Sequence, residues 1–121
     1  MAKTALIVDD SGVFLKMLES TLWALDYEVT EASDGQEALE KARLRHFDLV
    51  LTDQNMPRMD GVELIKGLRA LPSYRNVPIL MITTEASDEL KAQAKEAGAT
   101  GWLQKPTNPG KLLEVLNKVS G

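Results

Sequence analysis

Residues 49–61 read LVLTDQNMPRMDG, and this stretch decides the fold. An apolar run at 49–51 gives way to a polar turn that carries Asp53, Asn55 and Asp60. A continuous apolar run of this kind is typical of a strand that is covered on both faces of its sheet. The stretch therefore predicts a buried parallel strand whose carboxyl end delivers an aspartate to the surface.

Similar apolar runs recur along the chain and alternate with helical patterns. The other predicted strands are Ala5–Val8, the neighbourhood of Val29, Ile79–Ile82 and a weaker one at Gly101–Leu103. Apolar residues at helical spacing predict helices that contain Phe14 to Leu25, Leu39 and Ala42, Val62 to Leu68, Ser87 to Ala97, and Leu112 to Val119. Ser33 and Gln36 have the spacing of a capping box, and Gly98 suits a left-handed helix end.

The alternation of five strands with five helices predicts the fold class. Short connections between strand and helix require parallel strands and right-handed crossovers. The expected architecture is an α/β fold, a doubly wound five-stranded parallel sheet in the flavodoxin-like order 2-1-3-4-5 with helices on both faces. With 121 residues, the chain is expected to form one domain over residues 1–121.

Composition excludes several classes of function. Hydrophobic residues make up 44% and charged residues 26% of the chain, which is typical of a globular protein. The absence of cysteine excludes disulfides, thiolate metal sites and a cysteine nucleophile, and it fits a cytoplasmic protein. A net charge of -4 argues against binding to nucleic-acid phosphates. The sequence also predicts no signal peptide and no insertion into a membrane.

Polar residues follow four of the predicted strands at the point where each strand ends. They are Asp9 and Asp10, Asp53, Thr83 and Thr84, and Lys105. Because parallel strands end at the same edge of a sheet, these side chains are expected to meet there. A single aspartate at a strand end is more often a turn former or a helix cap, so the prediction depends on the joint arrangement.

The three carboxylates of Asp9, Asp10 and Asp53 would repel one another at such an edge. A hard divalent cation relieves this repulsion, and Mg²⁺ prefers oxygen ligands while keeping water molecules that a phosphate can replace. Asn55, two residues beyond Asp53, could add its main-chain carbonyl. The sequence therefore predicts a magnesium site.

Other readings of these motifs fail on particular residues. An EF-hand loop that started at Asp53 would have Pro57 at its fifth position and Leu64 at its twelfth, where a glutamate is needed. With His46 as the single histidine and no cysteine, a zinc site lacks its usual ligands. A Ser-His-Asp triad is disfavoured because His46 lies just before a predicted strand, outside the motifs, and no G-x-S-x-G elbow occurs. Neither of the usual glycine-rich phosphate-binding loops occurs.

Four motifs, VDD at 8–10, DLVLTDQNMPRMDG at 48–61, MITTE at 81–85 and GATGWLQKP at 98–106, resemble the receiver domain of two-component response regulators. The resemblance covers nearly the whole chain, and TDQNMPRMDG and GATGW are most similar to the stand-alone chemotaxis regulators of the CheY type. It implies a receiver domain without an output domain.

The resemblance also implies a role for each matching residue. Asp53 would accept a phosphoryl group from a kinase phosphohistidine, and Asp9, Asp10 and the Asn55 carbonyl would complete the Mg²⁺ site. Thr83 would sense the phosphoryl group through its hydroxyl, Lys105 would contact a phosphoryl oxygen, and Pro106 would follow a cis peptide bond. Trp102 stands at the aromatic switch position, where tyrosine is common in the family; without the resemblance, plain packing would be the favoured interpretation of this residue.

These roles describe a phosphoacceptor rather than an enzyme with turnover. The resemblance implies a histidine kinase of the CheA type as the phosphoryl donor. Its further implied partners are the flagellar motor switch or a phosphatase, and the chain is expected to be a monomer. A sink that drains phosphate from the kinase is an alternative. A magnesium-dependent aspartyl phosphohydrolase is a weaker one, because such enzymes carry a D-x-D pair and this chain has Asp53-Gln54-Asn55. A pseudo-receiver is disfavoured by the complete acidic set.

Overall fold

A computed structural model of the chain describes residues 3–85 and 87–120. The strands are β1 Lys3–Val8, β2 Tyr27–Ala32, β3 Leu49–Thr52, β4 Ile79–Thr83 and β5 Gly101–Gln104. The helices are α1 Gly12–Trp23, α2 Gly35–Leu44, α3 Gly61–Arg69, α4 Asp88–Ala97 and α5 Pro109–Ser120, with a 3₁₀ turn η1 at Pro72–Tyr74. Each predicted strand and helix is present in the predicted order.

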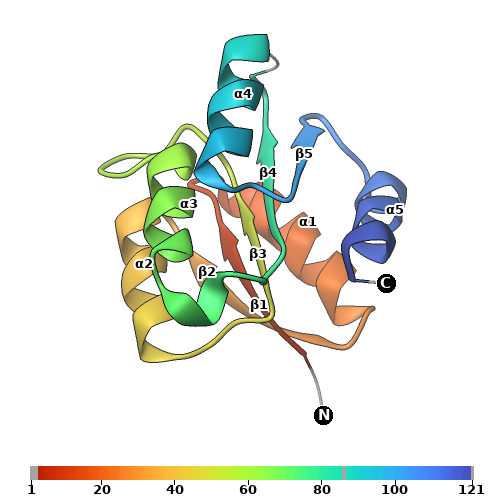
Figure 1. Cartoon of the computed structure of the whole chain (residues 1–121). Helices are drawn as coiled ribbons and strands as arrows, with labels where there is room; N and C mark the ends of the chain where they lie inside the picture. The colour runs from red at the N-terminus through yellow and green to blue at the C-terminus, as the bar shows by residue number, and fades with distance from the viewer. Residues whose placement is uncertain (1–2, 86, 121) are drawn as a thin grey trace.

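The five strands are parallel and follow the order β2-β1-β3-β4-β5, as predicted. Helices α1 and α5 contact each other, while α2 contacts α3 and α3 contacts α4. Figure 1 shows the resulting layers, with α1 and α5 on one side of the sheet and the other three helices on the opposite side. This arrangement leaves the carboxyl ends of the central strands uncovered at one edge.

Alternate residues of the central strands enter two separate apolar cores. Leu6, Val8, Val50 and Met81 belong to the core beneath α2, α3 and α4. Ile7 on β1, and the residues of β3 and β4 that face the same side of the sheet, belong to the core beneath α1 and α5. Burial on both faces explains why these strands are continuous apolar runs rather than alternating ones.

Helix ends agree with the sequence at some positions and correct it at others. Ser87 caps α4 by accepting a hydrogen bond from the Leu90 amide. Gly98 ends that helix at φ 113°, as predicted. The predicted capping box of Ser33 and Gln36 is wrong. Asp34 is the N-cap of α2, and the acid three residues later is Glu37.

The correction at α2 has a simple physical reason. Aspartate and serine both make good caps, and the capping position belongs to the residue whose side chain reaches the amide of the third helical residue. Asp34 accepts from the Glu37 amide at 2.8 Å. Ser33 lies one residue earlier and donates through its amide to the Glu37 carboxylate at 2.8 Å instead. Likewise, α1 ends at Trp23, so Leu25 lies beyond the helix predicted to contain it.

None of the helices among the described residues is long and apolar enough to cross a membrane.

Candidate functional site

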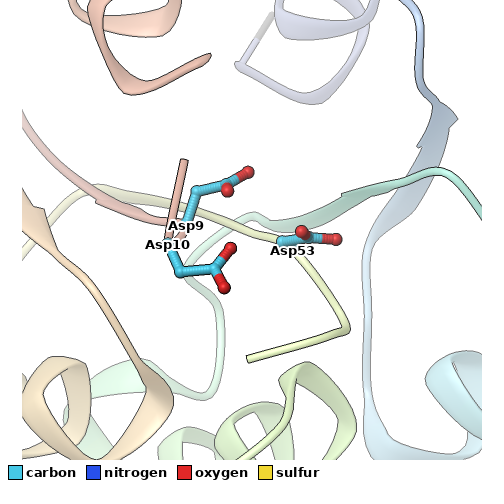
Figure 2. A group of neighbouring side chains, drawn as sticks. All are labelled: Asp9, Asp10 and Asp53. Carbon is cyan, nitrogen blue, oxygen red and sulfur yellow. The ribbon is translucent and has the colours of Figure 1, made fainter. Parts of the chain in front are cut away.

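The pairing of β1 with β3 brings the predicted acids together. Val8 and Thr52 are register partners at the carboxyl ends of these strands, and the Asp53 amide donates to the Val8 carbonyl at 2.9 Å. Asp9 and Asp10 follow Val8, so they leave β1 beside the point where Asp53 leaves β3. Figure 2 shows the three aspartate side chains grouped at these two strand ends.

The three carboxylates form one cluster. Each of Asp9, Asp10 and Asp53 contributes an oxygen atom that lies within 4.8 Å of the others. Asp9 is 1% exposed and Asp53 is 9% exposed, whereas Asp10 is open to solvent. The cluster therefore has a buried side formed by Asp9 and Asp53 and an open side at Asp10.

Lys105 supplies a positive charge to the buried side of this cluster. Its Nζ lies 2.6 Å from Asp9 Oδ2 and 3.2 Å from Asp53 Oδ2. The Lys105 amide donates to the Thr83 carbonyl at 2.8 Å, which fixes the lysine at the adjacent ends of β4 and β5. The peptide bond between Lys105 and Pro106 is cis, as predicted.

Burial and hydrogen bonding act in opposite directions on Asp9. Burial raises the pKa of Asp9 above its ordinary value, while the Lys105 ammonium and the Ser11 amide, which donates to Oδ1 at 2.9 Å, partly oppose that rise. The net pKa shift is upward, which means that the negative charge of Asp9 is incompletely balanced here.

Asp53 is oriented by its own chain. The Gln54 amide donates to Asp53 Oδ1 at 2.7 Å, which leaves Oδ2 facing Lys105. Gln54 accepts from the Gly61 amide through its main-chain carbonyl and from the Val62 amide through its side chain. A Cβ at Gly61 would lie 2.3 Å from the Asp53 carbonyl oxygen, so only glycine permits this close approach of α3 to the site.

Asn55 lies in the loop between β3 and α3, two residues beyond Asp53, and is exposed. The role of its carbonyl as a metal ligand stays a prediction. The chemistry of the clustered donors fits Mg²⁺, because the three carboxylates offer hard oxygen ligands. The lysine ammonium that bridges two of the acids shows that the cluster accommodates positive charge.

Thr83 and Trp102, the predicted switch residues, lie on neighbouring strands. Thr83 is the last residue of β4 and is fully buried, and its hydroxyl accepts from the Glu85 amide at 3.4 Å. Trp102 pairs with Met81 across β4 and β5 and packs against the core beneath α4. The residue is half-buried, and its indole N–H is buried without a hydrogen-bond partner among the described residues.

Two contributors to the site carried no signal in the sequence. Phe14 on α1 places its ring 4.1 Å from Lys105 Nζ, a cation–π distance that helps to hold the ammonium. Gln54 secures the start of α3, as described above. Phe14 is 91 positions from Lys105 in the chain, and only the sheet order brings them together.

An open, mainly apolar groove of about 460 Å³ adjoins the Lys105 side of the cluster. Val13, Phe14 and Met17 from α1 line one wall, and Pro106 and Thr107 line another. The acids are therefore reached beside an apolar surface rather than through a closed cavity.

The sheet order, the acidic cluster and the lysine after the last strand define the class of receiver domains. The pattern of the family described as Response regulator receiver domain matches residues 5–117, and the chain belongs to this family.

Within that class, the chain resembles chemotaxis proteins. It is 42% identical to chemotaxis protein CheY1 of Helicobacter pylori, over 96% of this chain and 95% of the relative. The structure of chemotaxis response regulator CheY4 of Vibrio cholerae matches with a TM-score of 0.93 and 47% identity, over 98% of this chain and 99% of that one. A receiver domain of a Pseudomonas aeruginosa sensor histidine kinase, with a magnesium ion coordinated in its active-site cleft, matches with a TM-score of 0.90 and 29% identity over the full length of both chains.

Proposed function

We propose that this chain is a single-domain response regulator of the chemotaxis type that accepts a phosphoryl group on Asp53 from a histidine kinase. The observation that carries this proposal is the cluster of Asp9, Asp10 and Asp53 within 4.8 Å, with Lys105 bridging two of its members. The similarity to chemotaxis proteins over nearly the whole chain supports the same assignment. The protein would act in the cytoplasm, where such kinases present their phosphohistidine.

The chemistry is a transfer between two nucleophiles. A lone pair of a carboxylate oxygen of Asp53 forms the new O–P bond while the P–N bond to the donor imidazole breaks. The imidazole nitrogen keeps the electron pair of that bond and takes up a proton. A magnesium ion held by Asp9, Asp10, Asp53 and the Asn55 carbonyl would shield the negative charges that meet in this step.

The residues of the chain orient and stabilise the two reacting groups. The Gln54 amide holds one oxygen of Asp53, so the carboxylate has a fixed direction. Lys105, 3.2 Å from the other oxygen, is placed to donate to an oxygen of the transferred phosphoryl group. Thr83 would contribute its hydroxyl from the end of β4.

Phosphorylation would change the surface formed by α4, β5 and α5. Each charge-assisted hydrogen bond to the phosphoryl group contributes about 1.5–3 kcal/mol, whereas an almost complete shift of a two-state element needs about 5.5 kcal/mol. Thr83, Lys105 and nearby amides must therefore act together. Movement of Thr83 toward the phosphoryl group would alter the packing near Trp102 and so present a new surface to the flagellar motor switch.

The test is a phosphotransfer assay with a matched acid variant. The protein is incubated with a phosphorylated chemotaxis kinase and Mg²⁺, and intact-mass and peptide spectra locate the label. We expect one phosphoryl group on Asp53, none after Asp53→Asn, and normal uptake after Asp26→Asn, since Asp26 is an exposed residue at φ 66° that asparagine tolerates. No uptake by the wild type, or undiminished uptake by Asp53→Asn, would contradict the proposal.

A second measurement separates a motor-binding regulator from a phosphate sink. The phosphorylated protein is titrated against the motor switch protein and, separately, mixed with a limiting amount of kinase and a second regulator. Tighter binding to the switch protein on phosphorylation supports the motor role. Competition for phosphate without such binding supports the sink. Steady release of phosphate from small phosphomonoesters would instead support a phosphohydrolase.

A further inference from the structure

The loop between β3 and α3 contains a residue in an unfavourable backbone conformation. Arg58 has φ 66°, in the left-handed region that residues other than glycine, asparagine and aspartate seldom adopt. Such a conformation is unfavourable for arginine and persists where other contacts determine it. The contacts of Arg58 should therefore reveal what holds this loop.

The Arg58 guanidinium is bound to the cap of another helix. Its Nε and Nη2 donate to Asp34 Oδ2 at 3.1 and 2.7 Å. The other oxygen of Asp34 accepts from the Glu37 amide at the start of α2. The Asp34 side chain is only 8% exposed, whereas that of Arg58 is 57% exposed, so a buried, fixed carboxylate anchors a cation at the surface.

The next residue makes a second link between the same two segments. The Gly35 amide donates to the Met59 carbonyl at 3.2 Å. A Cβ at Gly35 would lie 2.6 Å from that carbonyl oxygen, so the two backbones are in close contact. The loop is thus attached to α2 at positions 58 and 59 and to the start of α3 through Gln54.

Asn55 lies between these attachments, three residues from Arg58 and one from Gln54. We propose that Arg58 and Asp34 are positioning residues that hold the β3–α3 loop against α2 and thereby fix the Asn55 carbonyl beside the acidic cluster. This inference rests on the proposed function, because it assigns the pair a part in holding Mg²⁺ at Asp53.

Loss of the Arg58 charge and loss of its positioning contacts predict opposite changes in Mg²⁺ affinity. An experiment can therefore distinguish the two roles. Arg58 is a cation in the loop that follows Asp53, so its removal should strengthen the binding of Mg²⁺ if only long-range electrostatics mattered. Release of the loop should weaken that binding, because residues that orient metal ligands typically contribute a factor of about ten or more to affinity. The sign of the change therefore distinguishes a positioning residue from a mere surface charge.

The experiment measures Mg²⁺ affinity by calorimetry with the metal alone. Arg58→Gly removes the guanidinium but accommodates the positive φ, so the variant should fold. Arg75→Gly is the matched control, because Arg75 is an exposed arginine in the turn before β4 and has no ion pair among the described residues. We expect the affinity to fall about tenfold in Arg58→Gly and to stay unchanged in Arg75→Gly, with similar thermal midpoints in the absence of metal.

A second variant, Asp34→Asn, tests the other member of the ion pair. Asparagine keeps a cap for α2 but loses the charge that binds Arg58. The double variant should bind Mg²⁺ no more weakly than the weaker single variant, since both remove one contact. Equal or tighter binding in Arg58→Gly would overturn the inference while leaving the proposed function intact. Failure of the wild type to bind Mg²⁺ would overturn the proposed function itself.

Discussion

The buried negative charge of Asp9 destabilises the folded protein, and the fold alone does not require it. It is 1% exposed, it shares the cluster with two other acids, and burial raises its pKa despite the contact with Lys105. When folding raises the pKa of a carboxyl group, the ionised form of that group destabilises the folded state at neutral pH. The retention of such an acid fits a site that serves a ligand rather than stability.

Asp9→Asn is therefore expected to stabilise the metal-free protein at neutral pH. The neutral amide removes the buried negative charge, and Lys105 keeps Asp53 as its partner. We expect the free energy of unfolding to rise by about 1 kcal/mol, the usual scale of a single substitution, while Mg²⁺ binding is lost. Urea titration without metal and calorimetry with metal check the two results. A less stable variant would contradict this account of Asp9.

Tyr74 shows the opposite situation, a polar group whose partners are essential. The ring is fully buried, and its hydroxyl accepts from the Phe47 amide at 3.0 Å and faces the carbonyls of Ala42 and Arg45. Loss of the hydroxyl would leave the Phe47 amide without this partner.

We expect Tyr74→Phe to destabilise the fold by about 1–3 kcal/mol. The loss should appear as an earlier urea midpoint, with phosphorylation of Asp53 unchanged, since Tyr74 is remote from the acids in the turn before β4. Tyr27→Phe, at a half-buried tyrosine on β2, serves as the control. Equal stability of the Tyr74 variant and the wild type would show that these contacts contribute nothing.

The sequence predicts the position and role of some single residues but not of others. Asp9, Asp10, Asp53 and Lys105 could be placed because each follows a recognisable strand and parallel strands end at one edge. The role of Tyr74 could not be predicted, because its hydrogen-bond partners lie 27 to 32 positions away in the chain. Contacts of that kind are fixed by packing rather than by local pattern.

At the scale of elements, Arg69 joins three segments. From the end of α3 its guanidinium donates to the carbonyls of Tyr74, Val77 and Gly98 and to the Thr100 hydroxyl. These contacts connect α3 to the turn before β4 and to the end of α4. No acid pairs with Arg69 among the described residues, so its role is to satisfy carbonyl groups that helix ends leave free.

We expect Arg69→Met to cost about 2 kcal/mol or more in the free energy of unfolding, because several partly buried carbonyls lose their donor. Methionine retains most of the apolar stem. Lys66→Met, one turn earlier on the same helix and exposed, is the control. Amide hydrogen exchange should show the largest increase at the carboxyl end of α4. An increase spread evenly over the molecule would contradict a local connecting role.

The contact between Asp34 and Arg58 also predicts a pH dependence. The Glu37 amide and the Arg58 guanidinium hold the pKa of Asp34 below its ordinary value of 3.8. A lowered pKa means that the contribution of the carboxylate is present above pH 3.8 and is lost as the pH falls through the folded-state value. Wild type should exceed Asp34→Asn in stability by about 1 kcal/mol at neutral pH, allowing for the solvent around Arg58.

That difference should disappear under acid conditions, once Asp34 is protonated in both the folded and the unfolded state. Urea midpoints of the two proteins, measured across the acid range, check the prediction. A stability difference that persisted at the lowest pH would show that the amide side chain, rather than the charge, is responsible.

Elements illustrate where sequence patterns succeed and where they mislead. The start of α4 at Ser87 and its end at Gly98 could be predicted because each position depends on one residue type. For α2, the pattern predicts a cap one residue too early, because Ser33 and Asp34 are adjacent and both suit a cap. The choice between them depends on the orientation of the chain as it leaves β2, which no local pattern encodes.

At the scale of the whole molecule, the number and alternation of elements predict a doubly wound parallel sheet and favour the order 2-1-3-4-5 at this chain length, although no residue pattern encodes that order directly. The state of the switch has no such signal in the sequence. Trp102 is half-buried and packs against the core beneath α4. The short side chains of Ala94 and Ala97 are buried on the inner face of α4. The sequence shows that Trp102 is aromatic and that Ala94 and Ala97 are small. Only the tertiary structure shows how these residues are packed.

Phosphorylation should therefore be visible from Trp102. The chain has two tryptophans, and Trp23→Phe leaves Trp102 as the single indole. We expect the fluorescence of this variant to change when acetyl phosphate and Mg²⁺ are added, because the proposed movement of Thr83 alters the packing near the ring. The same change should be absent after Asp53→Asn in the Trp23→Phe background. An unchanged spectrum in protein that mass spectrometry shows to be phosphorylated would exclude a coupled Trp102.

The direction of β1 has a practical consequence for labelling. The strand runs from Lys3 at one edge of the sheet to Val8, directly before Asp9, at the other edge (Figure 1). Six residues of extended chain span about 20 Å. A fluorophore or an immobilisation handle attached ahead of Lys3 would thus sit on the far rim from the acids, where it can report binding events without obstructing them.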